Sequence, residues 1–293
     1  MIKEHQKELC KDIRNLGYKY GTSKVFCDFL ECAAIAVSNS VDPLHWEKRE
    51  KRYCEIMKSY TELEERQKLA DMFVTLVNAF EENITSGSGP EDVLGPVFHE
   101  LELHNEYNGQ FFTPQSLSDM MSAATEGNCK KTIEEKGYVS ICEPTCGSGV
   151  MVLSFAKSMM SAKYNYSQQL VVSATDIDIK CVHMAYLQLS LYGIPAVVTH
   201  GNTLTLEEWS RWYTPIYLID NWLWRQPCGN RNGKYADDEQ LKMFFNPLIF
   251  GHGGDKNGIS EKVENEEVCT TEQEEPPAVI IAENKNGQLK FDF

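Results

Sequence analysis

Residues 141–149 read Ile-Cys-Glu-Pro-Thr-Cys-Gly-Ser-Gly, and this stretch decides the fold. The apolar run YVSIC at 138–142 leads into it, and a helical pattern begins at Ser148. Glycines at a strand-to-helix turn let the backbone pass close to a ligand, and the first turn of the helix offers free N–H groups. A plain structural turn is the alternative interpretation of this pattern taken alone. The surrounding sequence has to decide between the two.

Short apolar runs alternate with helical periods on the carboxyl-terminal side of this stretch. A helix is predicted over 148–161, a strand over 170–176, a second helix over 179–191, and further strands at 195–200 and 215–219. Strands and helices that alternate at these lengths imply right-handed crossovers and a mainly parallel sheet. The sequence therefore predicts a doubly wound α/β fold, with ligands bound at the carboxyl ends of the strands.

A second acidic position strengthens the ligand interpretation. Asp176 ends the second predicted strand, as Glu143 ends the first. Acidic residues at this place in dinucleotide-binding folds accept hydrogen bonds from ribose hydroxyls. A solvated loop aspartate is the alternative.

The amino-terminal part has a different character, helical throughout residues 1–85. Apolar residues recur at spacings of three and four between Val25 and Ala34. Asp42-Pro43 and the pair Thr61 and Glu64 are patterns typical of helix starts, so at least three helices are expected. The Gly-, Ser- and Pro-rich stretch ITSGSGPEDVLG follows. We expect a helical domain at 1–85, an α/β domain at 86–250, and a disordered acidic tail at 251–293.

Charge and composition limit the partners. The chain has 293 residues, a net charge of −15 and ten cysteines, with no CxxC pair. No apolar run approaches the roughly 18 residues that a membrane span needs, so we expect a cytoplasmic protein with reduced thiols and no membrane contact. No metal site is predicted. Binding to DNA would require a local basic patch or a partner subunit, because phosphate neutralisation provides most non-specific affinity.

Three motifs in order resemble a known family. Residues 109–114 read GQFFTP, the loop 143–149 follows, and Asp176-Ile177-Asp178 ends the next strand. This arrangement resembles the adenine-specific DNA methylases related to the modification subunits of type I restriction systems. The resemblance covers about residues 90–205. It implies a Rossmann-like, doubly wound methyltransferase sheet after a helical domain, with S-adenosylmethionine as cofactor.

The resemblance also implies a set of cofactor contacts. Thr113 and its neighbour Phe112 would contact the methionine moiety, although Phe111 and Phe112 could instead be core aromatics. The loop would pass under the cofactor, Asp176 would bind the ribose, and Asn202 would lie near the adenine ring. Ile177, beside Asp176, is assigned as a further cofactor contact. The loop residues assigned in this way are Glu143, Pro144, Cys146, Gly147 and Gly149.

The family's catalytic tetrapeptide, Asn or Asp followed by Pro-Pro and an aromatic residue, is not found in this sequence. In the family it holds the target amine and stacks on a base flipped out of the duplex. The positional candidates are Asn221 with Trp222, after the predicted strand 215–219, and Asn246 before Pro247. The function implied is methylation of the exocyclic amine of DNA adenine in a restriction-modification context, with a possible specificity subunit. The alternative is a catalytically degenerate module that binds the cofactor or a partner.

Two further features remain. Tryptophans at 209, 212, 222 and 224 could stack on bases, but core or interface packing is the favoured interpretation. The acidic tail ends in an apolar peptide in which Gln288, Leu289, Phe291 and Phe293 resemble a sliding-clamp docking motif of bacterial replication proteins. A chance sequence or an edge strand is the alternative.

Overall fold

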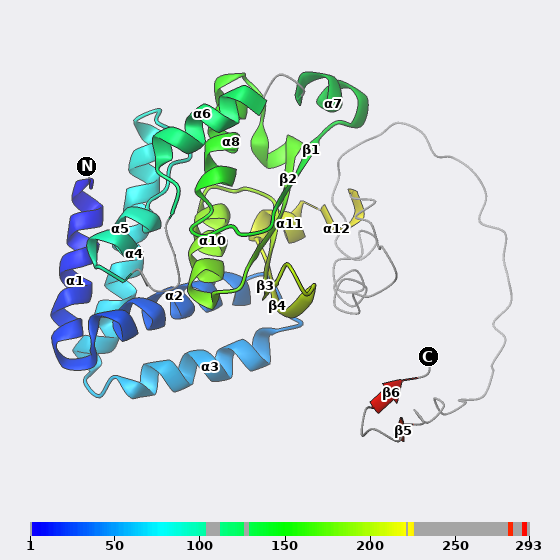
Figure 1. The fold of residues 1–293 in the computed structure, drawn as a ribbon. Coiled ribbons are helices and arrows are strands. Elements are labelled where there is room, and N and C mark those ends of the chain that lie inside the picture. Colours follow the sequence, from blue (N-terminus) through cyan, green and yellow to red (C-terminus); the bar gives the residue numbers. More distant parts are fainter. Residues whose placement is uncertain are drawn as a thin grey trace, which may run out of the picture. The chain divides into compact units, whose positions relative to one another are not determined.

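The computed structural model describes residues 2–103, 112–125, 129–220 and 222–225, together with the backbone of 281–283 and 289–291 (Figure 1). Residues 1–251 form one compact unit and residues 252–293 a second. Three parts of the predicted site, residues 109–111, Asn221 and Asn246, lie outside the described residues. Among the helices described, none is long and apolar enough to cross a membrane.

A four-stranded sheet forms the centre of the first unit. Its order is β1-β2-β3-β4, in which the first three strands are parallel and β4 is antiparallel to β3. The strands are β1 (Val139–Glu143), β2 (Leu170–Asp176), β3 (Ala196–Asn202) and β4 (Glu207–Tyr213). The three predicted parallel strands are confirmed, and so is the α/β fold with a helical amino-terminal region. Because β1, β2 and β3 run the same way, their carboxyl ends meet at one edge of the sheet.

Helices cover one face of the sheet in two layers. Alternate strand residues Val172, Ala196 and Val198 are buried against α8 (Val150–Ser161) and α10 (Ile179–Leu191), as a strand's two-residue period requires. The bounds of α10 match the predicted helix. A short α9 (Tyr166–Gln169) precedes β2. Beyond α10 lies α2, which packs directly against it (Figure 1).

The opposite face is covered by the segment that follows β4. Residues 215–219 form a helix, α11 (Pro215–Ile219), so the predicted strand is wrong. Pro215 takes the first helical position, where its missing N–H costs nothing, and the same residue could not donate to a sheet ladder. Thr214 before it remains extended, with its Oγ1 accepting from the Ala196 backbone N–H at 2.8 Å. A short α12 (Trp222–Arg225) follows.

The amino-terminal region contains four long helices, α1 (Glu4–Tyr20), α2 (Thr22–Asn39), α3 (Trp46–Ser59) and α4 (Leu63–Thr85). Three shorter helices follow before the first strand: α5 (Leu94–Glu100), α6 (Gln115–Thr125) and α7 (Cys129–Lys136). The predicted stripe between Val25 and Ala34 is buried in α2.

Two helix starts differ from expectation. The α3 helix begins at Trp46 rather than at Pro43, and the cap of α4 pairs Glu62 with Glu65, one residue after the predicted pair.

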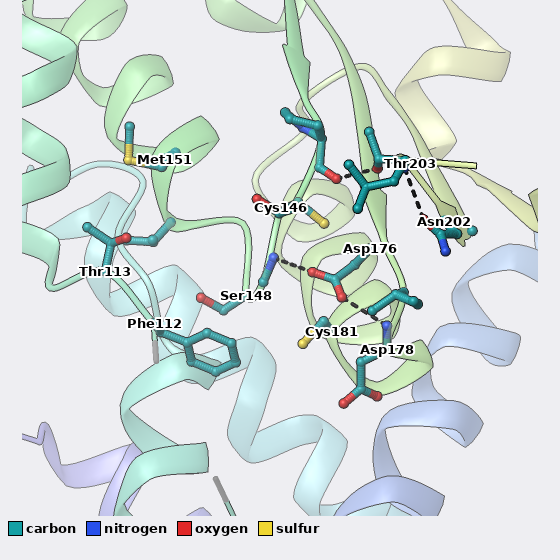
Figure 2. A pocket seen from close by; sticks show the side chains of 17 residues that line it. Phe112, Thr113, Cys146, Ser148, Met151, Asp176, Asp178, Cys181, Asn202 and Thr203 are labelled. Atoms are coloured by element: carbon teal, nitrogen blue, oxygen red, sulfur yellow. Dashed lines mark hydrogen bonds between the residues drawn. The ribbon is translucent and has the colours of Figure 1, made fainter. Parts of the chain in front are cut away.

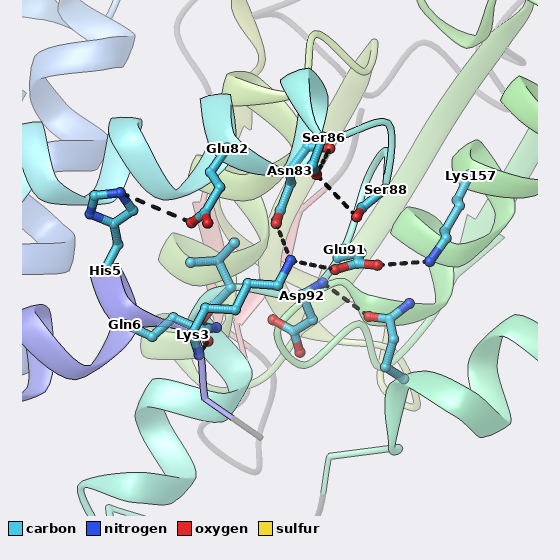
Figure 3. Close-up of polar contacts among 12 residues, drawn as sticks. Lys3, His5, Gln6, Glu82, Asn83, Ser86, Ser88, Glu91, Asp92 and Lys157 are labelled. Carbon is cyan, nitrogen blue, oxygen red and sulfur yellow. Dashed lines mark hydrogen bonds and ion pairs between the residues drawn. The ribbon is translucent and has the colours of Figure 1, made fainter.

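Polar contacts join this region to the α/β part beside the Gly-, Ser- and Pro-rich stretch at 84–95. The Glu91 carboxylate accepts from Lys3 Nζ and from Lys157 Nζ, each at 2.9 Å (Figure 3). Although burial alone would raise the pKa of Glu91, the two lysines lower it. Asn83 of α4 donates to the Tyr192 hydroxyl at 2.8 Å. The helices and the sheet are thus joined by buried and half-buried bonds within one compact unit.

A buried ion pair makes a second junction. Arg49 of α3 donates to Asp42 Oδ2 at 2.6 Å and to the Arg211 carbonyl of β4 at 2.7 Å. Its guanidinium lies 4.1 Å from the centroid of the Trp212 ring. Burial would raise the pKa of Asp42, but the His45 hydrogen bond and the Arg49 charge outweigh it, and the pKa is lowered.

The second unit holds two short antiparallel strands, β5 (Ile281–Glu283) and β6 (Leu289–Phe291), in which Ile281 pairs with Phe291. Leu289 and Phe291 of the predicted docking peptide therefore lie in an extended backbone, whereas Gln288 and Phe293 are outside the described residues. Docking to a sliding clamp stays a prediction.

Replacing Arg49 with alanine is expected to lower the free energy of unfolding by about 3–5 kcal/mol, because the buried Asp42 carboxylate would lose the guanidinium charge that is paired with it. The loss should shrink at acidic pH, where Asp42 can protonate. Urea unfolding at neutral and acidic pH measures both effects. Arg52→Ala is the control, since its pair with Glu31 is exposed and should contribute about 0–1 kcal/mol. Equal losses in the two variants would contradict a structural role for the buried pair.

Candidate functional site

A tight loop joins β1 to α8. Gly147 and Gly149 have φ angles of 54° and 93°, in the region that favours glycine, and the Gly149 N–H donates to the Cys146 carbonyl at 2.7 Å. A Cβ atom on Gly147 would lie 3.1 Å from the Phe112 ring. One on Gly149 would lie 3.5 Å from the Ala185 Cα of α10. Gly147 thus keeps the loop surface open on the side of Phe112, and Gly149 lets α8 pack closely on α10.

The Asp176 carboxylate at the end of β2 holds this loop. Its Oδ2 accepts from the Gly147 N–H at 2.8 Å and its Oδ1 accepts from the Asp178 N–H at 2.9 Å (Figure 2). The Cys146 N–H donates to the Thr175 carbonyl at 2.9 Å. Burial raises the pKa of Asp176 even though the two backbone bonds act against that shift. The carboxylate therefore fixes both loops and is a poorly solvated negative charge.

A buried network supports the loop from behind. Ser148 Oγ donates to Asp92 Oδ2 at 2.7 Å, and Gln188 Nε2 donates to Asp92 Oδ1 at 2.8 Å and to the Ser148 carbonyl at 2.7 Å. Gln188 Oε1 accepts from the Val93 N–H at 2.7 Å. Burial raises the pKa of Asp92. Sequence reasoning missed this network because its members lie about 40 to 95 positions apart, and no local pattern connects them.

The turn after β3 lies beside the loop after β1. Asn202 Oδ1 accepts from the Leu204 and Thr205 N–H groups at 2.9 and 3.3 Å, which turns the chain away from the strand. Thr203 Oγ1 donates to the Pro144 carbonyl at 2.6 Å, so this turn is tied to the loop after β1. Three consecutive strand ends are thereby connected to one another.

These three strand ends, with the chain at 112–113, enclose a cavity of about 490 Å³. Figure 2 shows Phe112, Thr113 and Met151 on one side and Asn202 and Thr203 on the other, with Asp176 between them. The predicted residues that line it are Phe112, Thr113, Pro144, Cys146, Gly147, Asp176, Ile177 and Asn202. Among the lining residues that sequence reasoning did not assign are Thr145, Ser148, Met151, Asp178, Cys181, Thr203 and Leu204.

Two predicted cofactor residues do not line the cavity. Glu143 accepts a bond from the Thr145 N–H at 3.4 Å, and its pKa is raised by burial and by the neighbouring Asp176 charge. Gly149 faces α10 instead. Glu143 therefore adds negative potential beside the cavity, and Gly149 serves the packing of the helices.

The charge of the cavity points to a ligand with positive charge and hydroxyl groups. Its lining includes the carboxylates of Asp176 and Asp178 and no lysine, arginine or histidine among the described residues. Asp178 forms an ion pair with Lys180 at 3.2 Å, which leaves Asp176 as the dominant charge. A carboxylate accepts up to about four hydrogen bonds, so Asp176 can receive ligand hydroxyls while it still holds Gly147 and Asp178.

Trp222 does not lie in this cavity. Its side chain is fully buried, and its ring makes an edge contact with Tyr138 at 5.5 Å between centroids. It packs in a cluster with Val171 and Leu218. Tyr138 and Val171 mark the amino ends of β1 and β2, whereas the cavity lies at the carboxyl ends. The structure therefore brings eight of the ten predicted cofactor residues together around the cavity, and it places Trp222 elsewhere.

A cavity beneath a glycine loop, with an acidic residue at the end of the second strand, is the nucleotide-cofactor geometry of Rossmann-like α/β proteins. The model of the N-6 DNA methylase family matches residues 93–247, and the chain belongs to that family. Among solved structures the chain is similar to a putative class I S-adenosylmethionine-dependent methyltransferase from Listeria monocytogenes, with 15% identity and a TM-score of 0.41 over 82% of this chain and 78% of that one. No curated protein sequence matches the chain.

Replacing Trp222 with alanine is expected to lower the free energy of unfolding by about 3–5 kcal/mol, because a large buried ring is lost from the core. Chemical denaturation of the full chain measures the loss. The control is Trp209→Ala, whose ring is 49% exposed and should cost about 0.5 kcal/mol or less. A Trp222 variant with unchanged stability would argue that the ring serves a ligand rather than the core.

Proposed function

We propose that the chain binds S-adenosylmethionine in the cavity at the ends of β1, β2 and β3 and transfers its methyl group to the exocyclic amine of adenine in DNA. The cofactor assignment rests on the Asp176 carboxylate, held by Gly147 and Asp178 at the centre of a cavity whose described lining includes no basic side chain. Family membership supports DNA as the substrate.

The residues present fit the cofactor. Asp176 would accept hydrogen bonds from the ribose hydroxyls. Ile177, which is 61% exposed, and Asn202 would contact the adenine ring. Phe112 and Thr113 would face the methionine moiety, and Gly147, with no Cβ, would let it pass over the loop. When bound, the cofactor supplies an activated sulfonium methyl group.

The chain's own contribution would be orientation. An in-line approach of an amine to an already activated methyl group requires the two partners to be held, and such positioning can supply roughly 7–11 kcal/mol. The bonds from Asp176 and Thr203 fix the loop after β1 from two sides. The cavity would thus present the cofactor in a single orientation.

Recognition of DNA would require a partner subunit. The net charge of −15 disfavours unaided binding to phosphates, so we include a specificity subunit and a restriction-modification setting in the proposal. Asn221 and Asn246 remain the candidates for holding the target amine.

A second candidate function is cofactor binding without methyl transfer. The burial of Trp222 at the amino ends of the strands favours it, because this ring is then not available to stack on a flipped base. The helical form of residues 215–219 favours it too, since the strand that should lead into a catalytic turn is replaced by α11.

Calorimetric titration with S-adenosylmethionine, followed by transfer of a tritiated methyl group to unmethylated bacterial DNA, separates the candidates. Binding with label on adenine is the result expected for the enzyme. Binding of S-adenosylmethionine without transfer of label to DNA supports the second candidate. This result counts only after the transfer assay has been repeated with a partner subunit, where one is encoded nearby. Absence of binding would overturn both.

Asp176→Asn is expected to weaken S-adenosylmethionine binding by about 1.5–3 kcal/mol, because charge-assisted bonds to the ribose are lost. In the natural chain the affinity should also fall as the pH drops towards the raised pKa of Asp176, since the protonated carboxyl binds a cation poorly. The variant should lack this pH dependence. Asp178→Asn is the matched control, a carboxylate in the same cavity that already pairs with Lys180. Equal effects of the two substitutions would mean that general charge, rather than Asp176, controls binding.

A further inference from the structure

A second cavity of about 330 Å³ lies between the helical region and β4. Its walls come from α2, α3, the start of α10 and β4, and we call it the α3–β4 cavity. Among the described residues, none lines both this cavity and the cofactor cavity, so its side chains take no part in the proposed methyl transfer.

The α3–β4 cavity is lined by four basic side chains, Lys48, Arg49, Arg52 and Arg211, and among its described lining residues Glu31 is the acidic one. Arg49 is paired with Asp42 at 2.6 Å and Arg211 with Glu208 at 2.7 Å, so the positive charge offered to a ligand comes from Lys48 and from the remaining donors of Arg52. Arg52 is held by Glu31 at 2.8 and 2.9 Å. A guanidinium has five N–H donors, so such a pair leaves donors for a ligand. Lys48 is exposed and forms no ion pair with any described residue, so its charge is available.

Two buried polar groups in the wall have no hydrogen-bond partner among the described residues. They are Nε2 of His183 and Nε1 of Trp212, on side chains 4% and 6% exposed. Burial lowers the pKa of His183 to about 3, so its ring is neutral. Buried polar atoms are satisfied in most proteins, and a pair of them beside a cavity points to a ligand that supplies the partners.

The wall also offers an aromatic surface. Trp209 is 49% exposed, unlike the packed Trp212, and its ring lies 4.7 Å from the His200 ring in an edge arrangement. His200 Nε2 lies 3.2 Å from the Ile177 carbonyl, which holds this edge in place. One side of the Trp209 indole is therefore supported by the protein while much of its surface stays accessible to a planar ring.

We propose that the α3–β4 cavity binds one nucleotide unit, with its base against Trp209 and its phosphate at Lys48 and Arg52. The polar edge of the base or sugar would then satisfy Trp212 and His183. The cavity volume suits a single small ligand, and base–aromatic stacking tolerates any base. A free mononucleotide and a nucleotide within a single strand present the same chemistry.

The test is calorimetric titration of the full chain with thymidine monophosphate. This probe is chosen because an adenine ring could enter the cofactor cavity and thymidine monophosphate has none. Thymidine and inorganic phosphate are titrated separately, and both should bind at least about tenfold more weakly than the nucleotide. An octathymidylate then separates the sources, since tighter binding of the strand assigns the site to nucleic acid and tighter binding of the monomer to a free nucleotide. Absence of nucleotide binding, or equal binding of phosphate alone, would overturn the proposal.

Matched variants locate the site. Lys48→Glu is expected to weaken nucleotide binding at least about tenfold, whereas Lys51→Glu, an exposed position on the same helix outside the cavity, should leave it unchanged. Trp212→Phe keeps the aromatic ring but removes the buried N–H, and should weaken binding about threefold or more. Equal effects of the two lysine variants would overturn the proposal. The affinity of the Lys48→Glu variant for S-adenosylmethionine should not change. Failure of the nucleotide-binding proposal can therefore be told apart from failure of the methyltransferase proposal, which the S-adenosylmethionine titration tests.

Discussion

The Asp176 carboxylate, which receives the backbone N–H groups of Gly147 and Asp178, is the contact on which the site depends. It joins the loop after β1 to the turn after β2, and Thr203 extends the connection to the turn after β3. Parallel strands bring their carboxyl ends to one edge, but only these bonds give the edge a fixed shape. The raised pKa of Asp176 follows from the same placement, because burial that positions the carboxylate also removes it from water.

The helical region takes part in this arrangement rather than merely preceding it. Gln188 of α10 bonds to Ser148 in the loop and to Val93 at the start of α5, so one buried amide supports both the loop and the segment that follows the amino-terminal helices. Arg49 makes the comparable junction between α3 and β4. Short, buried bonds therefore connect the amino-terminal region both to the loop and to the sheet.

Much of the fold could be predicted because its signals are local. The strand at 170–176 and the helix at 179–191 were predicted with their observed bounds, since the apolar run of the strand and the helical period of the helix each lie within the segment. Residues 215–219 were misread because an apolar run of five has no distinct period, and Pro215 favours a helix start as much as an edge strand. The antiparallel β4 was not predicted, because its half-exposed residues Glu207–Tyr213 depend on pairing with β3. Likewise, eight of the seventeen residues that line the cavity followed from the motif resemblance, whereas Asp92 and Gln188 act over long sequence separations.

The path of the chain after β3 limits what the described residues can do chemically. The chain first returns antiparallel as β4, which covers the free edge of β3, and then crosses the opposite face of the sheet as α11 to bury Trp222 near Tyr138. Both steps carry it away from the carboxyl ends of the strands. None of the described residues of β4, α11 and α12 lines the cofactor cavity, so an amide that holds a target amine there would come from outside these elements, as Asn221 and Asn246 do in the sequence, or from another subunit. The same path creates the α3–β4 cavity, because β4 is the strand that brings Trp209 and Arg211 against α3.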